Sequence, residues 1–177
     1  MSARIKIKRG LNIKLAGEAA RSVTVLPLPQ LFAVKPPDFA GLTPKLLVNT
    51  GDEVFAGTPL IYDKNNEAIK FSSPVSGEVV EILRGNKRRI LEIKILADKE
   101  IKYELFKKIN PDDLSRDEIK EALLKSGVWP FIRQRPFGTV ANPGEIPKSI
   151  FISAFDSNPL APDINFIIQD NDPDFQT

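Results

Sequence analysis

Short runs of alternating apolar and polar residues mark the N-terminal part of the chain. Basic and apolar side chains alternate over residues 4–8, and residues 11–15 repeat the pattern. Such alternation predicts half-buried strands, and the apolar run 23–26 predicts a third. Regular helix is excluded in the following stretch by Pro27, Pro29, Pro36 and Pro37. Apolar residues lie between these prolines, so we expect an extended, ordered connection.

Residues 43–100 carry many short apolar or alternating runs, separated by turn residues. We expect strands over residues 44–48, 60–62, 79–83 and 90–96, with shorter ones beginning at residues 54 and 69. The structural turns are assigned to Gly51, Gly57, Pro74 and Gly77, where glycine permits unusual backbone angles. Short, closely spaced strands of this kind predict a closed or sandwiched β-domain. The pattern resembles the lipoyl-like barrel-sandwich hybrid of biotin and lipoyl carriers.

The pattern changes after residue 100. Ser115, followed three residues later by Glu118, forms a capping-box motif that predicts a helix over residues 116–125, and Gly127 supplies its end. We expect residues 128–147 to be irregular. The continuous apolar run 149–155 predicts a buried parallel strand, as at the beginning of an α/β domain.

These patterns predict an α+β chain with four parts. Residues 1–42 hold N-terminal strands and a Pro-rich connection, and residues 43–100 form the lipoyl-like barrel-sandwich domain. Residues 101–147 form a short helical segment and an irregular linker. Residues 148–177 form the first strand and loop of a truncated α/β (Rossmann-like) domain.

Histidine and cysteine are both absent from the 177 residues. Their absence excludes imidazole bases, thiolate nucleophiles, zinc sites built on these ligands and cysteine-bound iron–sulfur clusters. The carboxylates form no evident pair, and no glycine-rich dinucleotide loop occurs. We therefore expect no catalytic residue, no metal site and no cofactor in this chain. The net charge of +2 argues against a nucleic-acid partner.

Targeting signals are also missing from the sequence. No apolar segment follows the basic residues at the N-terminus, as a signal peptide would require. No stretch approaches the roughly 20 apolar residues that span a bilayer. We therefore expect a cytoplasmic protein whose membrane role comes through partners.

One lysine and one basic run offer alternative functions. Lys64 lies near the hairpin tip where carriers of this fold hold their modified lysine, but the flanking methionines of such carriers are absent and the register differs. A solvated turn lysine is the simpler interpretation. The basic run 84–89 offers phosphates or anionic lipids a contact. Glu81 and Glu92 flank it, which favours an ordinary solvated hairpin.

An aromatic and arginine-rich segment is the best candidate for a ligand or partner surface. Rings next to guanidinium groups can hold a flat, partly polar ligand. Packing between domains is the alternative interpretation. The candidate residues are Trp129, Phe131, Arg133, Arg135 and Phe137.

Several segments, in order, resemble one family. They are residues 5–11 with Ala16 and Gly17, the turn 51–54, the run 69–82, residues 126–129 with Arg133 and the motif 135–137, and the run 151–161. Together they resemble the A subunit of the bacterial sodium-translocating NADH:quinone oxidoreductase.

This resemblance implies a function. The complex passes electrons from NADH to quinone and exports sodium, and its A subunit is peripheral and lies on the cytoplasmic side of the inner membrane. The resemblance implies that flavins and the iron–sulfur cluster lie in partner subunits, and it makes quinone a candidate ligand. We expect a docking scaffold without a catalytic site of its own.

The sequence also departs from relatives of that family. The NADH-binding subunit of respiratory complex I and its counterpart in the ferredoxin-linked pump place a glycine-rich flavin and nucleotide loop near residues 127–137. Trp, Arg, Pro and Phe replace it here, so NADH and FMN binding are not expected. The family's chains are longer, and we expect an experimental fragment or a natural truncation. A non-catalytic binding or carrier-like barrel module, including an exported efflux-type adaptor, remains the alternative.

Overall fold

The computed structural model describes residues 16, 20–107, 110, 113–153, 156, 158, 161 and 163–168. The expected strands over residues 4–8 and 11–15 lie outside the described residues. The chain divides into two compact units: residues 27–146 form one, and residues 1–26 with 147–177 form the other.

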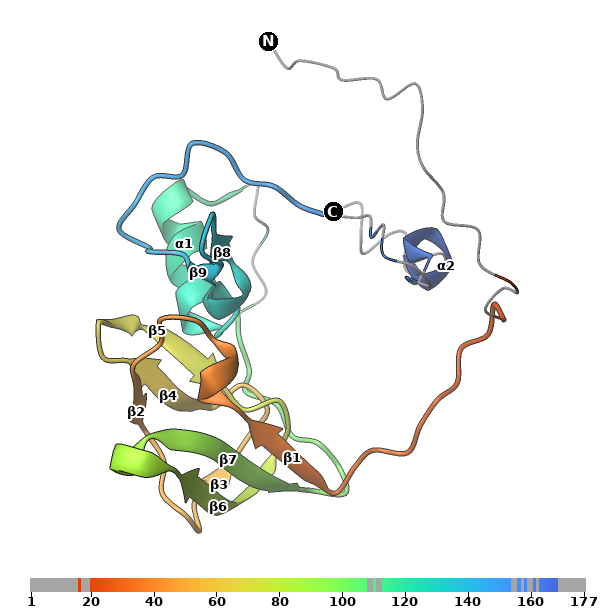
Figure 1. Ribbon diagram of the computed structural model, residues 1–177, viewed down its shortest axis with the longest axis vertical. Helices are drawn as coiled ribbons and strands as arrows, with labels where there is room; N and C mark the ends of the chain where they lie inside the picture. Colours follow the sequence, from red (N-terminus) through yellow and green to blue (C-terminus); the bar gives the residue numbers. More distant parts are fainter. Residues whose placement is uncertain are drawn as a thin grey trace. The chain divides into compact units, whose positions relative to one another are not determined.

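Two antiparallel sheets form the barrel-sandwich of the larger unit (Figure 1). The four-stranded sheet has the order β1-β7-β6-β3, and the three-stranded sheet has the order β2-β4-β5. The strands are β1 (Leu31–Val34), β2 (Pro44–Leu46), β3 (Glu53–Val54), β4 (Pro59–Asp63), β5 (Asn66–Ser72), β6 (Gly77–Arg84) and β7 (Ile90–Ala97). The predicted barrel-sandwich fold is confirmed.

The core lies between the two sheets. Apolar side chains of both sheets form it, and five of them are completely buried: Leu60, Ile61, Val79, Ile93 and Ile95. Burying each side chain of this size stabilises the fold by about 1.5–3 kcal/mol. Both sheets contribute to one cluster, so they fold as a single unit.

Two of the turn glycines are required by geometry. Gly57 has a φ of +106°, which side chains rarely adopt. At Gly77 a Cβ would lie 1.9 Å from the carbonyl oxygen of Leu96, because β6 and β7 approach each other closely there. Gly51 lies in the turn before β3, and exposed Pro74 lies in the bend between β5 and β6.

The expected strand over residues 23–26 is wrong. These residues have no regular structure and are exposed, Val25 to 91%. They pair with no described strand, and Pro27 interrupts the backbone donors that a ladder needs. The sheet instead takes β1 from within the Pro-rich stretch, where Leu31 pairs with Leu96 and Val34 with Ile93. The 3-10 helix η1 (Pro36–Asp38) follows it.

Helix α1 (Arg116–Lys125) confirms the capping-box prediction. The Ser115 hydroxyl accepts from the Glu118 backbone N–H (3.4 Å), and a Glu118 carboxylate oxygen accepts from the Ser115 N–H (2.8 Å). The Ser115 hydroxyl also donates to this carboxylate oxygen (2.6 Å). This bond, together with the one from the Ser115 N–H, lowers the pKa of Glu118, because both stabilise its charged form. Gly127 ends the helix region with a φ of +75°.

The segment after α1 is more ordered than expected. The 3-10 helix η4 (Trp129–Phe131) leads into a small hairpin of β8 (Arg133–Gln134) and β9 (Thr139–Val140). Arg133 pairs with Val140 across this hairpin, and the turn between the strands occupies residues 135–138. The expectation of a wholly irregular linker over 128–147 is therefore wrong.

The smaller unit does not form the predicted buried strand. Ile150, Phe151 and Ile152 have no regular structure and are exposed, Phe151 to 90%. An apolar run becomes a buried strand only where other strands pair with it. The described residues of this unit include no such strand. They do include helix α2 (Ile164–Ile168) and an exposed ion pair between Arg21 and Asp163 (3.2 Å).

Candidate functional site

An apolar groove of about 440 Å³ lies within the larger unit. Its walls come from three places: the end of β1 with η1, the corner after β5, and the segment that joins α1 to η4. The residues that line the groove include Lys35, Phe39, Phe71, Ser72, Val128 and Phe131.

A pair of aromatic rings forms one wall of the groove. Phe39 follows η1 and meets Phe71 of β5 edge-to-face, with ring centroids 4.6 Å apart. This arrangement is a favourable one for two aromatic rings. The Arg133 guanidinium lies 4.8 Å from the centre of the Phe39 ring. The wall is therefore fixed by contacts between η1, β5 and the β8–β9 hairpin.

Gly127 packs closely against Ser72 at the groove. A Cβ at Gly127 would lie 2.3 Å from the Ser72 hydroxyl oxygen, so only glycine fits there without a shift. Among the described residues, the buried Ser72 hydroxyl has no hydrogen-bond partner. A buried hydroxyl in this state costs about 1–3 kcal/mol.

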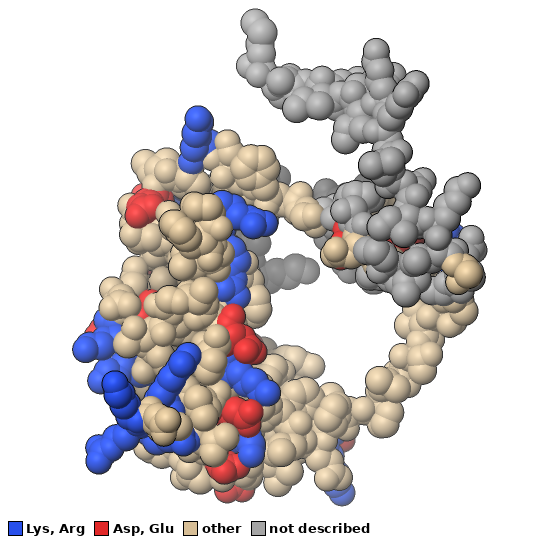
Figure 2. All heavy atoms as spheres, viewed as in Figure 1, with Lys and Arg blue, Asp and Glu red and all other residues tan. Residues whose placement is uncertain are grey.

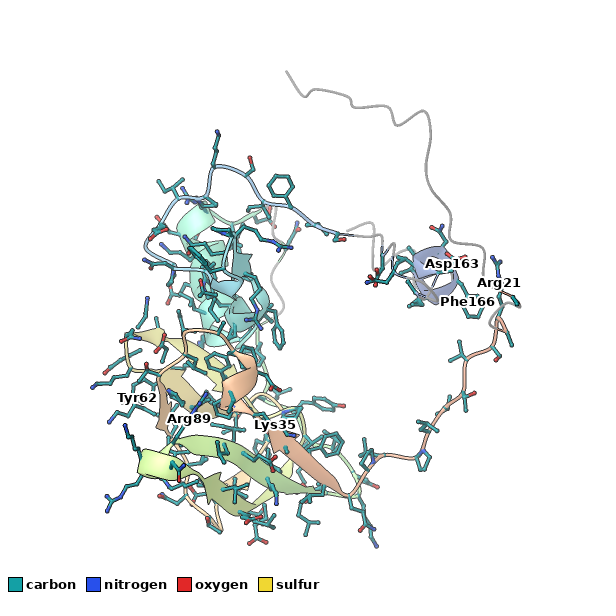
Figure 3. The ribbon with its side chains drawn as sticks, in the orientation of Figure 1. Arg21, Lys35, Tyr62, Arg89, Asp163 and Phe166 are labelled. Carbon is teal, nitrogen blue, oxygen red and sulfur yellow. The ribbon has the colours of Figure 1, made fainter. Side chains whose placement is uncertain are left out.

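Three other polar side chains of the groove have partners. Lys35 at the end of β1 (labelled in Figure 3) forms an ion pair with Glu92 (3.3 Å). The Ser126 hydroxyl donates to the Leu123 carbonyl oxygen (3.2 Å), as a C-terminal side chain of α1 often does. The Ser73 hydroxyl donates to the Val75 carbonyl oxygen. The groove thus combines apolar and aromatic walls with the Lys35 ammonium, the Asp38 carboxylate and one unpartnered hydroxyl.

The structure places the five predicted surface residues in three different positions. Phe131 lines the groove and is 72% exposed, and Arg133 reaches the groove wall through Phe39. Trp129 packs against the barrel core, and its Nε1–H donates to the Ala141 carbonyl oxygen (2.8 Å). Arg135 and Phe137 lie in the β8–β9 turn, outside the groove lining. Their role in ligand or partner binding stays a prediction.

Four groove residues were not predicted from the sequence: Lys35, Phe39, Phe71 and Ser72. They come from β1, η1 and β5, far from residue 131 in the chain. Phe39 and Phe71 appear in the sequence as ordinary core positions. Gly127 ends the predicted helix and belongs to the 126–129 motif of the family resemblance, but neither role indicates its close approach to Ser72.

Lys64 lies at the exposed turn between β4 and β5. Its backbone N–H donates to the Thr43 carbonyl oxygen (2.9 Å). In the described part of the chain, no three Asp or Glu side chains come together as a metal site would need. No helix of that part combines the length and apolar character needed to cross a bilayer.

Two family models match the chain. Residues 5–98 match the NqrA N-terminal barrel-sandwich hybrid domain, and residues 114–177 match the NqrA second alpha/beta domain. The predicted α/β class of the C-terminal part is therefore supported, although its first strand is not formed as expected.

Curated relatives match along almost the whole chain, and each is the A subunit of a Na(+)-translocating NADH-quinone reductase. The protein from Tolumonas auensis is 37% identical over 93% of this chain, that from Alcanivorax borkumensis 35% over 97%, and that from Yersinia pseudotuberculosis 37% over 93%. The matched region spans 38%, 39% and 37% of these relatives, respectively. These matches, together with the barrel-sandwich fold, show that the chain belongs to the NqrA family.

Proposed function

We propose that this chain forms the N-terminal part of a peripheral, cofactor-free subunit of a sodium-pumping NADH:quinone oxidoreductase. In this role it lies on the cytoplasmic side of the bacterial inner membrane. Partner subunits hold the flavins and the iron–sulfur cluster, transfer electrons from NADH to quinone, and export sodium. The observation that carries the proposal is the ordered match to both NqrA domains, over residues 5–98 and 114–177.

The barrel-sandwich acts as a docking scaffold in this proposal. The absence of cysteine and histidine supports the role, since this chain has no thiolate or imidazole to ligate a redox metal. Affinity purification of the tagged full-length protein from native membranes tests it. We expect flavin-bearing membrane subunits and NADH:quinone activity to co-purify. Recovery of the protein alone, without such subunits, would contradict the proposed role in the complex.

The groove at Phe131 is the proposed place of quinone contact. Its volume is within the range of about 300–1,000 Å³ that is typical of small-molecule sites. The quinone ring is flat and largely apolar, which suits the walls formed by Phe39, Phe71 and Phe131. The carbonyl oxygens of a quinone accept hydrogen bonds, and the Lys35 ammonium in the groove lining is a donor.

Two variants of the full-length protein, assembled in its complex, test the quinone contact. We expect Phe131→Ala to raise the KM for quinone about 10-fold, because a lost aromatic contact is worth about 1–1.5 kcal/mol. The NADH-dependent reduction of an artificial acceptor stays unchanged. Phe137→Ala is the matched control, since Phe137 is in the same segment and 84% exposed but outside the groove. Equal KM values for quinone in the two variants would contradict the proposed quinone contact in this groove.

A further inference from the structure

Four basic side chains lie at one end of the barrel-sandwich, in and beside the turn that joins β6 to β7. We call Arg84, Lys87, Arg88 and Arg89 the basic tip. All four residues are exposed. Figure 2 shows blue side chains projecting from this end of the larger unit, where Figure 1 places the turn.

The backbone of the basic tip is fixed by its own hydrogen bonds. The Gly85 N–H donates to the Arg89 carbonyl oxygen (2.8 Å), and the Arg89 N–H donates to the Asn86 carbonyl oxygen (3.2 Å). Lys87 and Arg88 have φ values of +56° and +59°, which few residues other than glycine adopt. These bonds close the backbone of the basic tip into a short loop, and the Arg84 guanidinium donates to the Arg88 carbonyl oxygen (3.3 Å).

The acidic residues beside the basic tip do not neutralise it. The Lys94 ammonium lies 2.7 Å from a Glu81 carboxylate oxygen, and this contact raises the pKa of Lys94. Lys35 lies 3.3 Å from Glu92. The two carboxylates that flank the run in sequence are thus already paired with other lysines. Within the part of the chain that the structure describes, no ion pair involves a residue of the basic tip.

Four exposed cations without a carboxylate partner among the described residues attract a surface of phosphate groups. We propose that the basic tip binds the anionic headgroups of a lipid bilayer and so orients the barrel-sandwich on the membrane. Leu83, which is 37% exposed beside Arg84, adds an apolar side chain for the headgroup boundary. No aromatic residue lies between residues 83 and 91 to stack on bases, and the chain's net charge is only +2, so a nucleic acid is disfavoured.

Vesicle co-sedimentation of the 177-residue chain tests the proposal. The probes are vesicles of phosphatidylcholine with about 30% phosphatidylglycerol, and vesicles of phosphatidylcholine alone. We expect binding to the anionic vesicles only, weakening as salt rises. Arg88→Gln combined with Arg89→Gln should weaken it about 30-fold, from about 1 kcal/mol per basic residue near an anionic surface.

Two further double variants separate the outcomes. Lys99→Gln combined with Lys125→Gln removes the same charge from exposed positions elsewhere and should leave most of the binding. Arg84→Gln combined with Lys87→Gln is a second tip variant and should show the same loss, which guards against misfolding of one variant. Equal binding by tip and control variants, equal binding to both kinds of vesicle, or tighter binding to single-stranded RNA would overturn the proposal. None of these outcomes depends on quinone or on the other subunits.

Discussion

Gly127 lies against Ser72 so closely that a Cβ at residue 127 would be 2.3 Å from the serine hydroxyl oxygen and 3.1 Å from its Cβ. This contact joins the end of the α1 region to the last residue of β5. It places the segment that contains Phe131 against the barrel. It also covers the Ser72 hydroxyl, which has no partner among the described residues. The shape of the groove depends on it.

Gly127→Ala should therefore destabilise the larger unit for two reasons. The left-handed backbone at φ +75° costs a residue with a Cβ about 1–2 kcal/mol. The collision with Ser72 should add about 1 kcal/mol, the lower end of overpacking costs. Urea unfolding measures the sum. Gly138→Ala is the control, because Gly138 has a φ of +67° but nothing within 4 Å of a Cβ. If the free energy of unfolding falls equally in both variants, the contact with Ser72 does not contribute to the cost of Gly127→Ala.

The two serines Ser72 and Ser76 should respond in opposite directions to replacement by alanine. Ser72→Ala removes an unpartnered buried hydroxyl and should leave the free energy of unfolding unchanged or raise it by about 1 kcal/mol. Ser76 is completely buried, and its hydroxyl donates to Asp98 (2.9 Å) and accepts from the Lys102 N–H (2.8 Å). Ser76→Ala should lower that free energy by about 1–3 kcal/mol. Denaturant titrations of both variants check this, and a larger loss at Ser72 would be inconsistent with the structure.

Ser115→Ala should remove the capping box and cost about 1 kcal/mol at neutral pH. The effect should depend on pH, because the bonds to Ser115 lower the pKa of Glu118. A carboxyl whose pKa is lower in the folded state stabilises the fold at higher pH. That stabilisation is lost as the pH falls from about 4.3 through the lowered value.

Urea titrations at pH 7 and in this acidic range measure the pH dependence. The difference in stability between Ser115→Ala and the unchanged chain should shrink in acid. Glu121→Gln is a control on the same helix, at an exposed position away from the cap. A difference that stays constant with pH would show that the carboxylate of Glu118 does not contribute.

Local signals explain which parts of the fold were predictable. The capping box at Ser115 and Glu118 acts within four residues, so the sequence alone locates α1. In β7 the burial of side chains alternates from Ile93 onward as the sequence pattern predicts, with Ile93 and Ile95 buried. The barrel-sandwich was predictable because many such short signals agree.

Long-range partners explain the rest. Residues 150–152 have the composition of a buried strand, but burial needs partner strands, which no local pattern supplies. Leu31–Val34 becomes β1 because it pairs with the edge of β7. The surrounding prolines make this strand hard to predict from the local sequence. The groove combines Phe39, Phe71 and Phe131 from separate elements, so only the fold could bring them together.

The most direct test of a quinone groove uses the single tryptophan of the chain as a reporter. Trp129 precedes the groove residue Phe131 by two positions and is fixed by its bond to Ala141. Titration with ubiquinone-1, followed by Trp129 fluorescence, should give saturable quenching whose apparent Kd rises about 10-fold in Phe131→Ala and stays unchanged in Phe137→Ala. Quenching that never saturates, or that is the same in all three proteins, would contradict quinone binding in this groove.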